Sequence, residues 1–192
     1  ALASLGDTST KNTNHFLCDI YVRWDSDWYL SIIEGGYRTD EFLAFQSGAT
    51  NFAFFPFYPL LVITTQYYWE LSSISAGLLV SNLSFVAALL LIFEYTQLLN
   101  LSHRAGIGAV ILICFIPQSF IFSAIYTEST FLLLLTAAMY ALRKQYYLAA
   151  GLCAAMLSAT RANGIFFIIF AGAWLDRKST RLNSSHLDIS YA

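Results

Sequence analysis

Apolar residues fill most of the chain from residue 75 onward, in runs separated by short polar breaks. Residues 75–98 form the longest run, and about 20 apolar residues suffice to cross a bilayer as a helix. Residues 105–125 form a second predicted crossing, in which Pro117 is expected to kink or break the helix. Three shorter apolar helices are predicted after it, at residues 128–142, 146–159 and 164–175. The pattern therefore predicts an all-α, polytopic transmembrane protein.

A different pattern precedes these runs, in the segment RWDSDWYLSIIEGGY at residues 23–37. Trp24, Trp28 and Ile32 recur at the spacing of one helix face, and a pair of glycines provides a stop. The predicted helix is too short to cross a membrane. Because tryptophan favours the boundary between membrane and water, we expect an interfacial helix.

The segment NFAFFPFYPLL, residues 51–61, is aromatic and twice interrupted by proline. Proline lacks a backbone N–H and fixes φ, so it bends or interrupts a helix. We interpret this segment as a bent stretch that enters the membrane.

Composition agrees with a membrane protein, since 57% of the residues are hydrophobic and only 11% are charged. Soluble domains carry about 25% charged residues. The net charge of −2 offers no basic surface for nucleic acid. The three cysteines are scattered and show no spacing with histidine that would hold a metal. We therefore expect no metal, no other cofactor and no nucleic-acid partner.

The last residues, DRKSTRLNSSHLDISYA at 176–192, differ abruptly in composition from the apolar chain before them. They resemble the translation of a sequencing-library adapter. We interpret this tail as not native, the alternative being a polar cytoplasmic tail. The chain is also expected to be truncated at both ends, with one crossing missing upstream and several missing downstream.

The short loops between the predicted crossings indicate an orientation. Counting crossings from Asp25 places Arg104, Arg143 and Lys144 together on one side, with no acid between them. The positive-inside rule makes that side cytosolic. The remaining charged positions of interest converge on the opposite, extracytoplasmic side: Asp25, Asp27, Glu34, Glu128 and Arg161.

Asp25 is the most informative of these charges. At the start of a helix its carboxylate is favoured electrostatically, and it shares a face with Trp28 and Tyr29, which would form aromatic walls suited to a sugar. A simple helix-capping role explains the position equally well. Asp27 lies roughly 200° further round the helix, so the two carboxylates are not expected to act as a pair.

Glu128 and Arg161 also have two interpretations each. Glu128 begins a predicted helix, where it either caps the helix or takes part in a site. Arg161 lies between two short apolar halves, where its planar guanidinium suits a carboxylate partner or a phosphate. Pairing with a carboxylate is the favoured interpretation.

Four motifs resemble one family in order and spacing: RWDSDWYLSIIEGGY, NFAFFPFYPLL, IYTES and TRANG. The chain resembles the endoplasmic-reticulum GPI mannosyltransferases that add the second mannose, the PIG-V family of GT-C membrane glycosyltransferases. The resemblance implies a GT-C-like fold with a lumenal loop that carries the interfacial helix. Residues 1–66 would form that loop and the re-entry into the membrane, residues 67–175 the transmembrane helical region, and residues 176–192 the non-native tail.

The resemblance also implies a reaction. Mannose would move from dolichyl-phosphate mannose, in α-1,6 linkage and with inversion, to the first mannose of a GPI glycolipid precursor. Asp25 would be the catalytic base, and Arg161 would stabilise the leaving phosphate. The expected substrate-binding residues are Trp24, Trp28, Tyr29, Glu34, Asn51, Pro56, Tyr126, Glu128, Arg161 and Asn163.

The protein is accordingly expected in the endoplasmic-reticulum membrane, as a multi-pass protein with a lumenal active site. Its expected partners are the lipid donor, the GPI precursor and membrane lipid, and an accessory membrane subunit is left open. The fragment alone is expected to be inactive.

Other functions stay open at this point. One is a GT-C glycosyltransferase that uses a polyprenyl-phosphate sugar and another acceptor. A transporter with broken helices around Glu128 and Arg161 would be expected to show internal repeats, and none is evident. A purely structural membrane subunit gives no reason for charges to gather on one side.

Overall fold

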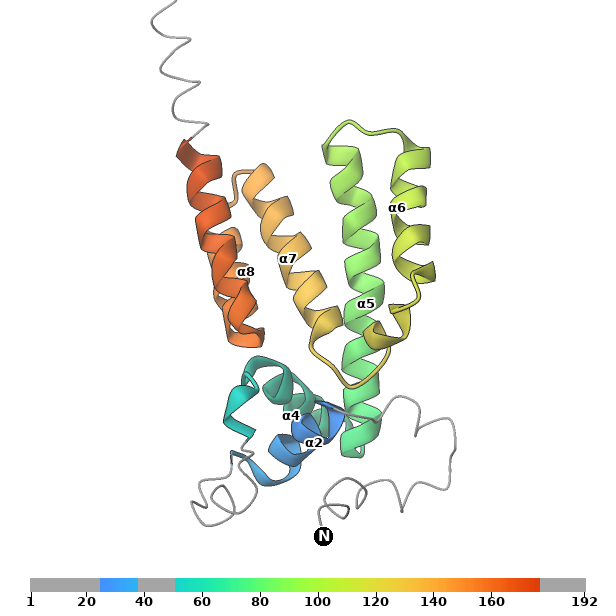
Figure 1. Cartoon of the computed structure of the whole chain (residues 1–192), viewed down its shortest axis with the longest axis vertical. Helices are drawn as coiled ribbons and strands as arrows, with labels where there is room; N and C mark the ends of the chain where they lie inside the picture. Colours follow the sequence, from blue (N-terminus) through green and yellow to red (C-terminus); the bar gives the residue numbers. More distant parts are fainter. Residues whose placement is uncertain (1–24, 38–50, 177–192) are drawn as a thin grey trace, which may run out of the picture.

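The computed structural model describes residues 25–37 and 51–176, and within these ranges the regular elements are all helical (Figure 1). Helices α5 to α8 stand side by side, and α2 and α4 gather at one end of them. Residues 166–176 form a final helix. The elements before it are α2 (Asp25–Gly35), η2 (Asn51–Ala53), α4 (Phe57–Trp69), α5 (Ser73–Leu98), α6 (His103–Phe115), η3 (Ser119–Phe122), α7 (Glu128–Arg143), α8 (Tyr147–Thr160) and η4 (Ala162–Ile165).

Helix α5 confirms the helix predicted for the longest apolar run, residues 75–98. Its 26 residues extend about 39 Å at 1.5 Å per residue, and the Ser72 side chain caps its first turn by accepting from the Ser75 N–H. Within the described residues it is the one helix long and apolar enough to cross a membrane. The other apolar helices are shorter, so the number of crossings stays a prediction.

The second predicted crossing, residues 105–125, is broken rather than kinked. Helix α6 ends at Phe115, and Ile116 is extended, with ψ at 146°. Pro117 explains the break because proline disfavours the helical conformation of the residue before it. The chain continues through the short η3 to the start of α7, so this region is a short helix followed by an irregular return.

The remaining predicted helices lie within one or two residues of the observed ones. Helix α7 packs against both α5 and α8. A buried cluster joins α7 and α8 to the final helix; its members are Leu134, Ala138, Ala141, Leu142, Ala150, Ala154, Leu157 and Phe167. Across the turn between the two helices, Gln145 adopts a positive φ of 66°.

Helix α2 confirms the predicted helix near the amino end and its glycine stop. Gly36 follows it with φ at +73°, a conformation that glycine adopts without strain. The Asn51 side chain, 2% exposed, donates to the Gly36 carbonyl oxygen at 3.1 Å. Asn51 therefore ties the 51–55 segment to the end of α2. Trp24 lies outside the described residues.

The chain alternates in direction between the two ends of the helix group. In Figure 1, α5 and α7 run away from the end that holds α2, and α6 and α8 run back toward it. As a result α2, the start of α7 and the end of α8 lie at the same end. Helix α4 runs through residue 66. The predicted division there, between a lumenal loop and a transmembrane region, stays a prediction.

Candidate active site

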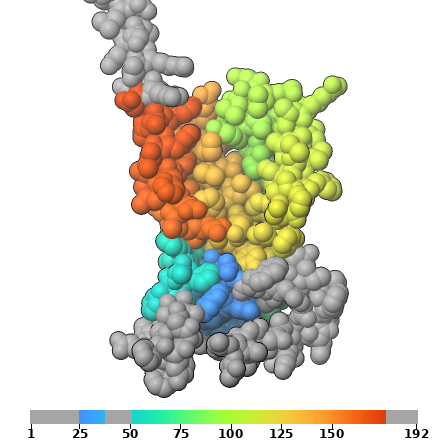
Figure 2. All heavy atoms as spheres, viewed as in Figure 1, coloured from blue at the N-terminus to red at the C-terminus, as the bar shows by residue number. Residues whose placement is uncertain are grey.

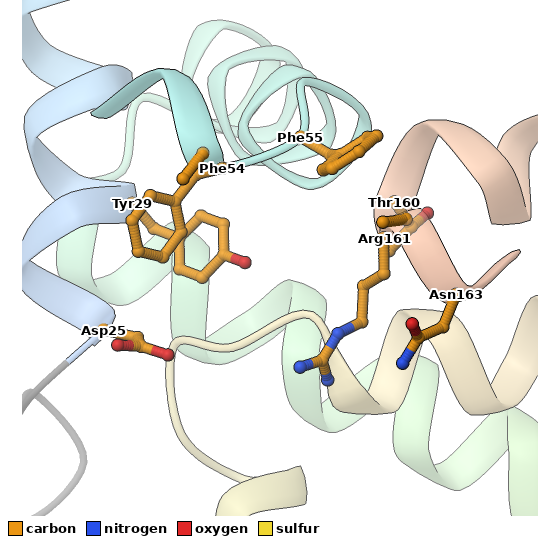
Figure 3. A pocket seen from close by; sticks show the side chains of 9 residues that line it. Asp25, Tyr29, Phe54, Phe55, Thr160, Arg161 and Asn163 are labelled. Atoms are coloured by element: carbon orange, nitrogen blue, oxygen red, sulfur yellow. The ribbon is translucent and has the colours of Figure 1, made fainter. Parts of the chain in front are cut away.

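A cavity of about 250 Å³ lies between α2, the 51–55 segment and the turn after α8 (Figure 3). These three segments are far apart in sequence. The lining residues are Asp25, Tyr29, Ala53, Phe54, Phe55, Thr160, Arg161, Ala162 and Asn163. In Figure 2 the same segments, blue, teal and orange, meet below the upright helices.

Two opposite charges face each other across this cavity. Asp25 is the first residue of α2, is solvent-exposed, and carries its carboxylate on the α2 side. Arg161 extends its guanidinium from the end of α8 toward it (Figure 3). The N-terminus of a helix favours a negative charge, so the first position of α2 suits a carboxylate.

Arg161 is held by an ion pair. Its Nη1 lies 2.6 Å from Oε1 of Glu128, the first residue of α7. The side chains of Arg161 and Glu128 remain 42% and 29% exposed. The ion pair confirms the favoured interpretation of Arg161, that it pairs with a carboxylate. A guanidinium has further N–H donors in its planar fork, so this pairing leaves donors that can reach an anion in the cavity.

The turn that presents Arg161 depends on the last residue of the TRANG motif. Helix α8 ends at Thr160, and Arg161 is extended before the chain enters η4. The Gly164 N–H donates to the Arg161 carbonyl oxygen at 2.9 Å. A Cβ added at Gly164 would lie 2.6 Å from the Ser158 nitrogen and closer still to the Leu157 carbonyl. Only glycine allows the turn to lie this close to α8.

Aromatic rings form one wall of the cavity. Tyr29 packs edge-on against Phe54, with ring centroids 4.9 Å apart, and Trp28 stacks on Phe54 from behind at 5.9 Å. The Tyr29 hydroxyl donates to the Thr127 hydroxyl oxygen at 3.5 Å. Burial raises the pKa of the Tyr29 phenol, and the negative charge of Glu128 adds to this effect. Tyr29 is therefore neutral at physiological pH and offers an apolar face to a ligand.

Tyr126 contacts the first turn of α2. Its side chain is 9% exposed and forms hydrogen bonds with the Ser26 side chain and the Asp25 backbone. Burial raises the pKa of the Tyr126 phenol, and the neighbouring Asp25 carboxylate raises it further. A neutral phenol thus anchors the residues that carry the candidate base.

The structure brings four of the sequence-predicted site residues to the cavity: Asp25, Tyr29, Arg161 and Asn163. The others that are described lie outside its lining. Glu128 contacts Arg161, Trp28 lies behind Phe54, and Asn51 is buried at the end of α2. Glu34 and Pro56 are exposed. Their substrate-binding roles stay predictions, as does that of Trp24, which lies outside the described residues.

Sequence reasoning missed five lining residues: Ala53, Phe54, Phe55, Thr160 and Ala162. A signal existed for all five. Three belong to the aromatic run at residues 51–61, and the other two belong to the TRANG motif. Within residues 25–37 and 51–176, no group of three or more His, Cys, Asp or Glu side chains could hold a metal ion.

In the described residues, the helical architecture and the carboxylate and arginine that face one another across an aromatic cavity fit a membrane glycosyltransferase. Comparison with known proteins identifies its family. Residues 4–175 match the model of the family described as Mannosyltransferase (PIG-V). The chain therefore belongs to the PIG-V mannosyltransferase family, which confirms the resemblance carried by the four motifs.

Curated relatives agree with this assignment. The chain is 31% identical over 158 residues to the GPI alpha-1,6-mannosyltransferase 2 of Rattus norvegicus. The aligned residues cover 77% of this chain and 30% of that protein. The protein of the same name from Mus musculus is 32% identical over 157 residues, with the same coverage. GPI mannosyltransferase 2 of Cryptococcus neoformans is 30% identical over 147 residues, covering 76% of this chain and 34% of the relative.

The chain thus spans about a third of the length of the curated relatives that it matches. No solved structure matches it.

Proposed function

We propose that the full-length protein containing this chain transfers mannose from dolichyl-phosphate mannose to the 6-hydroxyl of the first mannose of a GPI precursor. The observation that carries the proposal is the Asp25 carboxylate facing the Arg161 guanidinium across an aromatic cavity, in a member of the PIG-V family. The names of the rat and mouse relatives specify a GPI acceptor and an α-1,6 linkage, and they support the same choice here.

The two charged groups suit a single inverting displacement. The acceptor 6-hydroxyl oxygen attacks the anomeric carbon of mannose, and Asp25 accepts the hydroxyl proton as general base. The bond between the anomeric carbon and the phosphate oxygen breaks, and dolichyl phosphate leaves with the electron pair. Arg161 stabilises the negative charge on that phosphate. The β-linked donor then gives an α-linked product.

The cavity wall fits this assignment. A hexose presents its C–H groups on its faces and its hydroxyls at its edge. Tyr29 and Phe54 can pack against a sugar face, while Asn163 and Arg161 offer donors to hydroxyl or phosphate oxygens. A bound mannose would therefore lie between the base on α2 and the cation after α8.

We further propose that the protein is a multi-pass protein of the endoplasmic-reticulum membrane and that this cavity is lumenal. Helix α5 is a candidate crossing. Arg143 and Lys144 lie at the end of α7 opposite to Glu128, and the positive-inside rule assigns such a basic end to the cytosol.

This orientation predicts the outcome of glycosylation mapping. An acceptor tag inserted after Gly36 is expected to be glycosylated, and the same tag inserted after Lys144 is expected to stay unmodified. The natural Asn100-Leu101-Ser102 sequence at the α5–α6 turn is a built-in control and should also stay unmodified, since it lies at the cytosolic end in this orientation. Finding both tags modified, or neither, would contradict the proposed crossing pattern.

A direct assay tests the function. The full-length protein would be expressed in cells that lack their own second GPI mannosyltransferase, and microsomes would be given radiolabelled dolichyl-phosphate mannose and a precursor with one mannose. The expected product carries a second mannose that an α-1,6-specific mannosidase removes. Transfer to an unrelated acceptor would favour the other lipid-phosphosugar transferase, and absence of any transfer would reject the glycosyltransferase assignment for this protein.

A further inference from the structure

We propose that residues 124–129 act as an alignment segment, in which Tyr126 positions Asp25 and Glu128 positions Arg161. Both are then positioning residues and not substrate-binding ones. The inference rests on the proposed function, because it assigns Asp25 and Arg161 to one reaction.

The alignment segment is itself firmly held. Four of its side chains are at most 2% exposed: Ala124, Ile125, Thr127 and Ser129. Ile125 packs against α5 at Gly77, where an added Cβ would lie 3.0 Å from the Ile125 Cγ2. The Ser129 hydroxyl donates to the Phe122 carbonyl oxygen. Buried, closely packed side chains of this kind leave the segment little freedom to shift.

One connection runs from the alignment segment to α2. Tyr126 forms hydrogen bonds with the Ser26 side chain and the Asp25 backbone, and Ser26 is fully buried. The Tyr29 hydroxyl adds a second link, to Thr127. These contacts fix the first turn of α2, which carries the Asp25 carboxylate at the edge of the cavity.

The other connection runs to the end of α8. Glu128 pairs with Arg161 at 2.6 Å, and the two residues are 33 positions apart in sequence. Glu128 is only two residues after Tyr126, so one short stretch fixes both the carboxylate on α2 and the guanidinium after α8. The separation of the candidate base and cation is therefore set by the alignment segment.

Neither Tyr126 nor Glu128 lines the cavity, and each contacts a residue that does. A side chain in this position affects the reaction by aiming its neighbour. Its removal lowers activity only while that neighbour is present. This dependence distinguishes a positioning residue from one that contacts the substrate directly.

A double-mutant cycle in the full-length protein tests the inference. The variants are Glu128→Gln, Arg161→Gln and the double variant, each measured at matched levels of membrane-inserted protein for kcat and for the KM of the lipid-phosphate sugar that the wild type uses as donor. Glu128→Gln alone is expected to lower kcat/KM by about tenfold, because the two members of one ion pair are coupled. In the Arg161→Gln background the same change is expected to cost less than about twofold.

Two further variants serve as matched controls. Tyr126→Phe keeps the ring and acts through Asp25, so its effect should multiply with that of Arg161→Gln. Glu128→Asp keeps the charge and should restore part of the activity that Glu128→Gln loses.

Independent effects of Glu128→Gln and Arg161→Gln would overturn the inference, because Glu128 would then contact the substrate itself. A Glu128→Gln protein that fails to accumulate while Arg161→Gln accumulates normally would also overturn it, by making Glu128 a residue of the fold alone. The pattern of coupling is measured with whichever sugar the wild type transfers. Failure of the proposed mannose transfer is therefore seen separately, in the wild-type protein.

Discussion

Asp25→Asn in the full-length protein is expected to lower mannose transfer by about 10²–10⁴-fold, the usual contribution of a general base. The amide has nearly the size of the carboxylate, so the contacts of α2 with the 51–55 segment should persist. Asparagine is also well tolerated at the start of a helix, so a purely capping role of Asp25 would survive the change. Only the proton-accepting charge at the edge of the cavity is removed.

Cells lacking the native enzyme would receive each variant, and surface GPI-anchored protein would be measured beside the amount of membrane-inserted enzyme. Asp27→Asn is the matched control, because Asp27 belongs to the same turn of α2 but does not line the cavity. It should retain most of the activity. If Asp25→Asn restores anchored protein as well as the wild type does and Asp27→Asn does not, Asp27 is the base and the site must be reassigned.

Gly164→Ala is expected to reduce activity by about 10²-fold, since a displacement of roughly 1 Å in an active site costs that much. The added Cβ would meet the Ser158 nitrogen at 2.6 Å and the Leu157 carbonyl closer still. These are backbone atoms of α8, which cannot rotate away. The turn must shift instead, and Arg161 moves with it because its carbonyl accepts from the Gly164 N–H. The destabilisation should be about 1–3 kcal/mol, as for other overpacked sites.

Gly151→Ala is the control for this prediction. Gly151 lies within α8, and a Cβ added there meets nothing within 4 Å. Alanine favours a helix over glycine by about 1 kcal/mol, so this variant should be as stable as the wild type or slightly more so. Thermal unfolding in detergent and the transfer assay would be compared for the two variants. Equal activity of Gly164→Ala and the wild type would show that the turn does not fix Arg161.

The sequence predicts those parts of the fold that depend on local pattern. The spacing of Trp28 and Ile32 and the glycine pair predict α2 and its end, because periodicity and positive φ are local properties. The apolar run at residues 75–98 likewise predicts α5. The sequence of the second apolar run leaves two outcomes open, since a proline permits either a kink or an end of the helix. The extended conformation of Ile116 decides it.

The site was predicted in part. Ionisable residues in an apolar chain are costly, and this pointed to Asp25, Glu128 and Arg161. Their mutual arrangement, the pairing of Glu128 with Arg161 and the contact of Tyr126 with α2 depend on packing between distant segments. The same limit applies to Asn51. The family resemblance implies a substrate-binding role for it, which stays a prediction, and local pattern gives no sign of its hydrogen bond to the Gly36 carbonyl oxygen.

The shortness of α8 bears on how deep the cavity lies in a bilayer. From Tyr147 to Thr160 the helix has 14 residues, or about 21 Å at 1.5 Å per residue, whereas the hydrocarbon layer is about 30 Å thick. If α8 starts at the cytosolic boundary, Arg161 lies several ångströms beneath the opposite surface. A phosphate carried on a membrane lipid reaches such a depth from the side, with its chain remaining in hydrocarbon. A sugar nucleotide dissolved in water would have to shed its hydration to descend there. In the proposed orientation, such a depth would favour a lipid-borne donor.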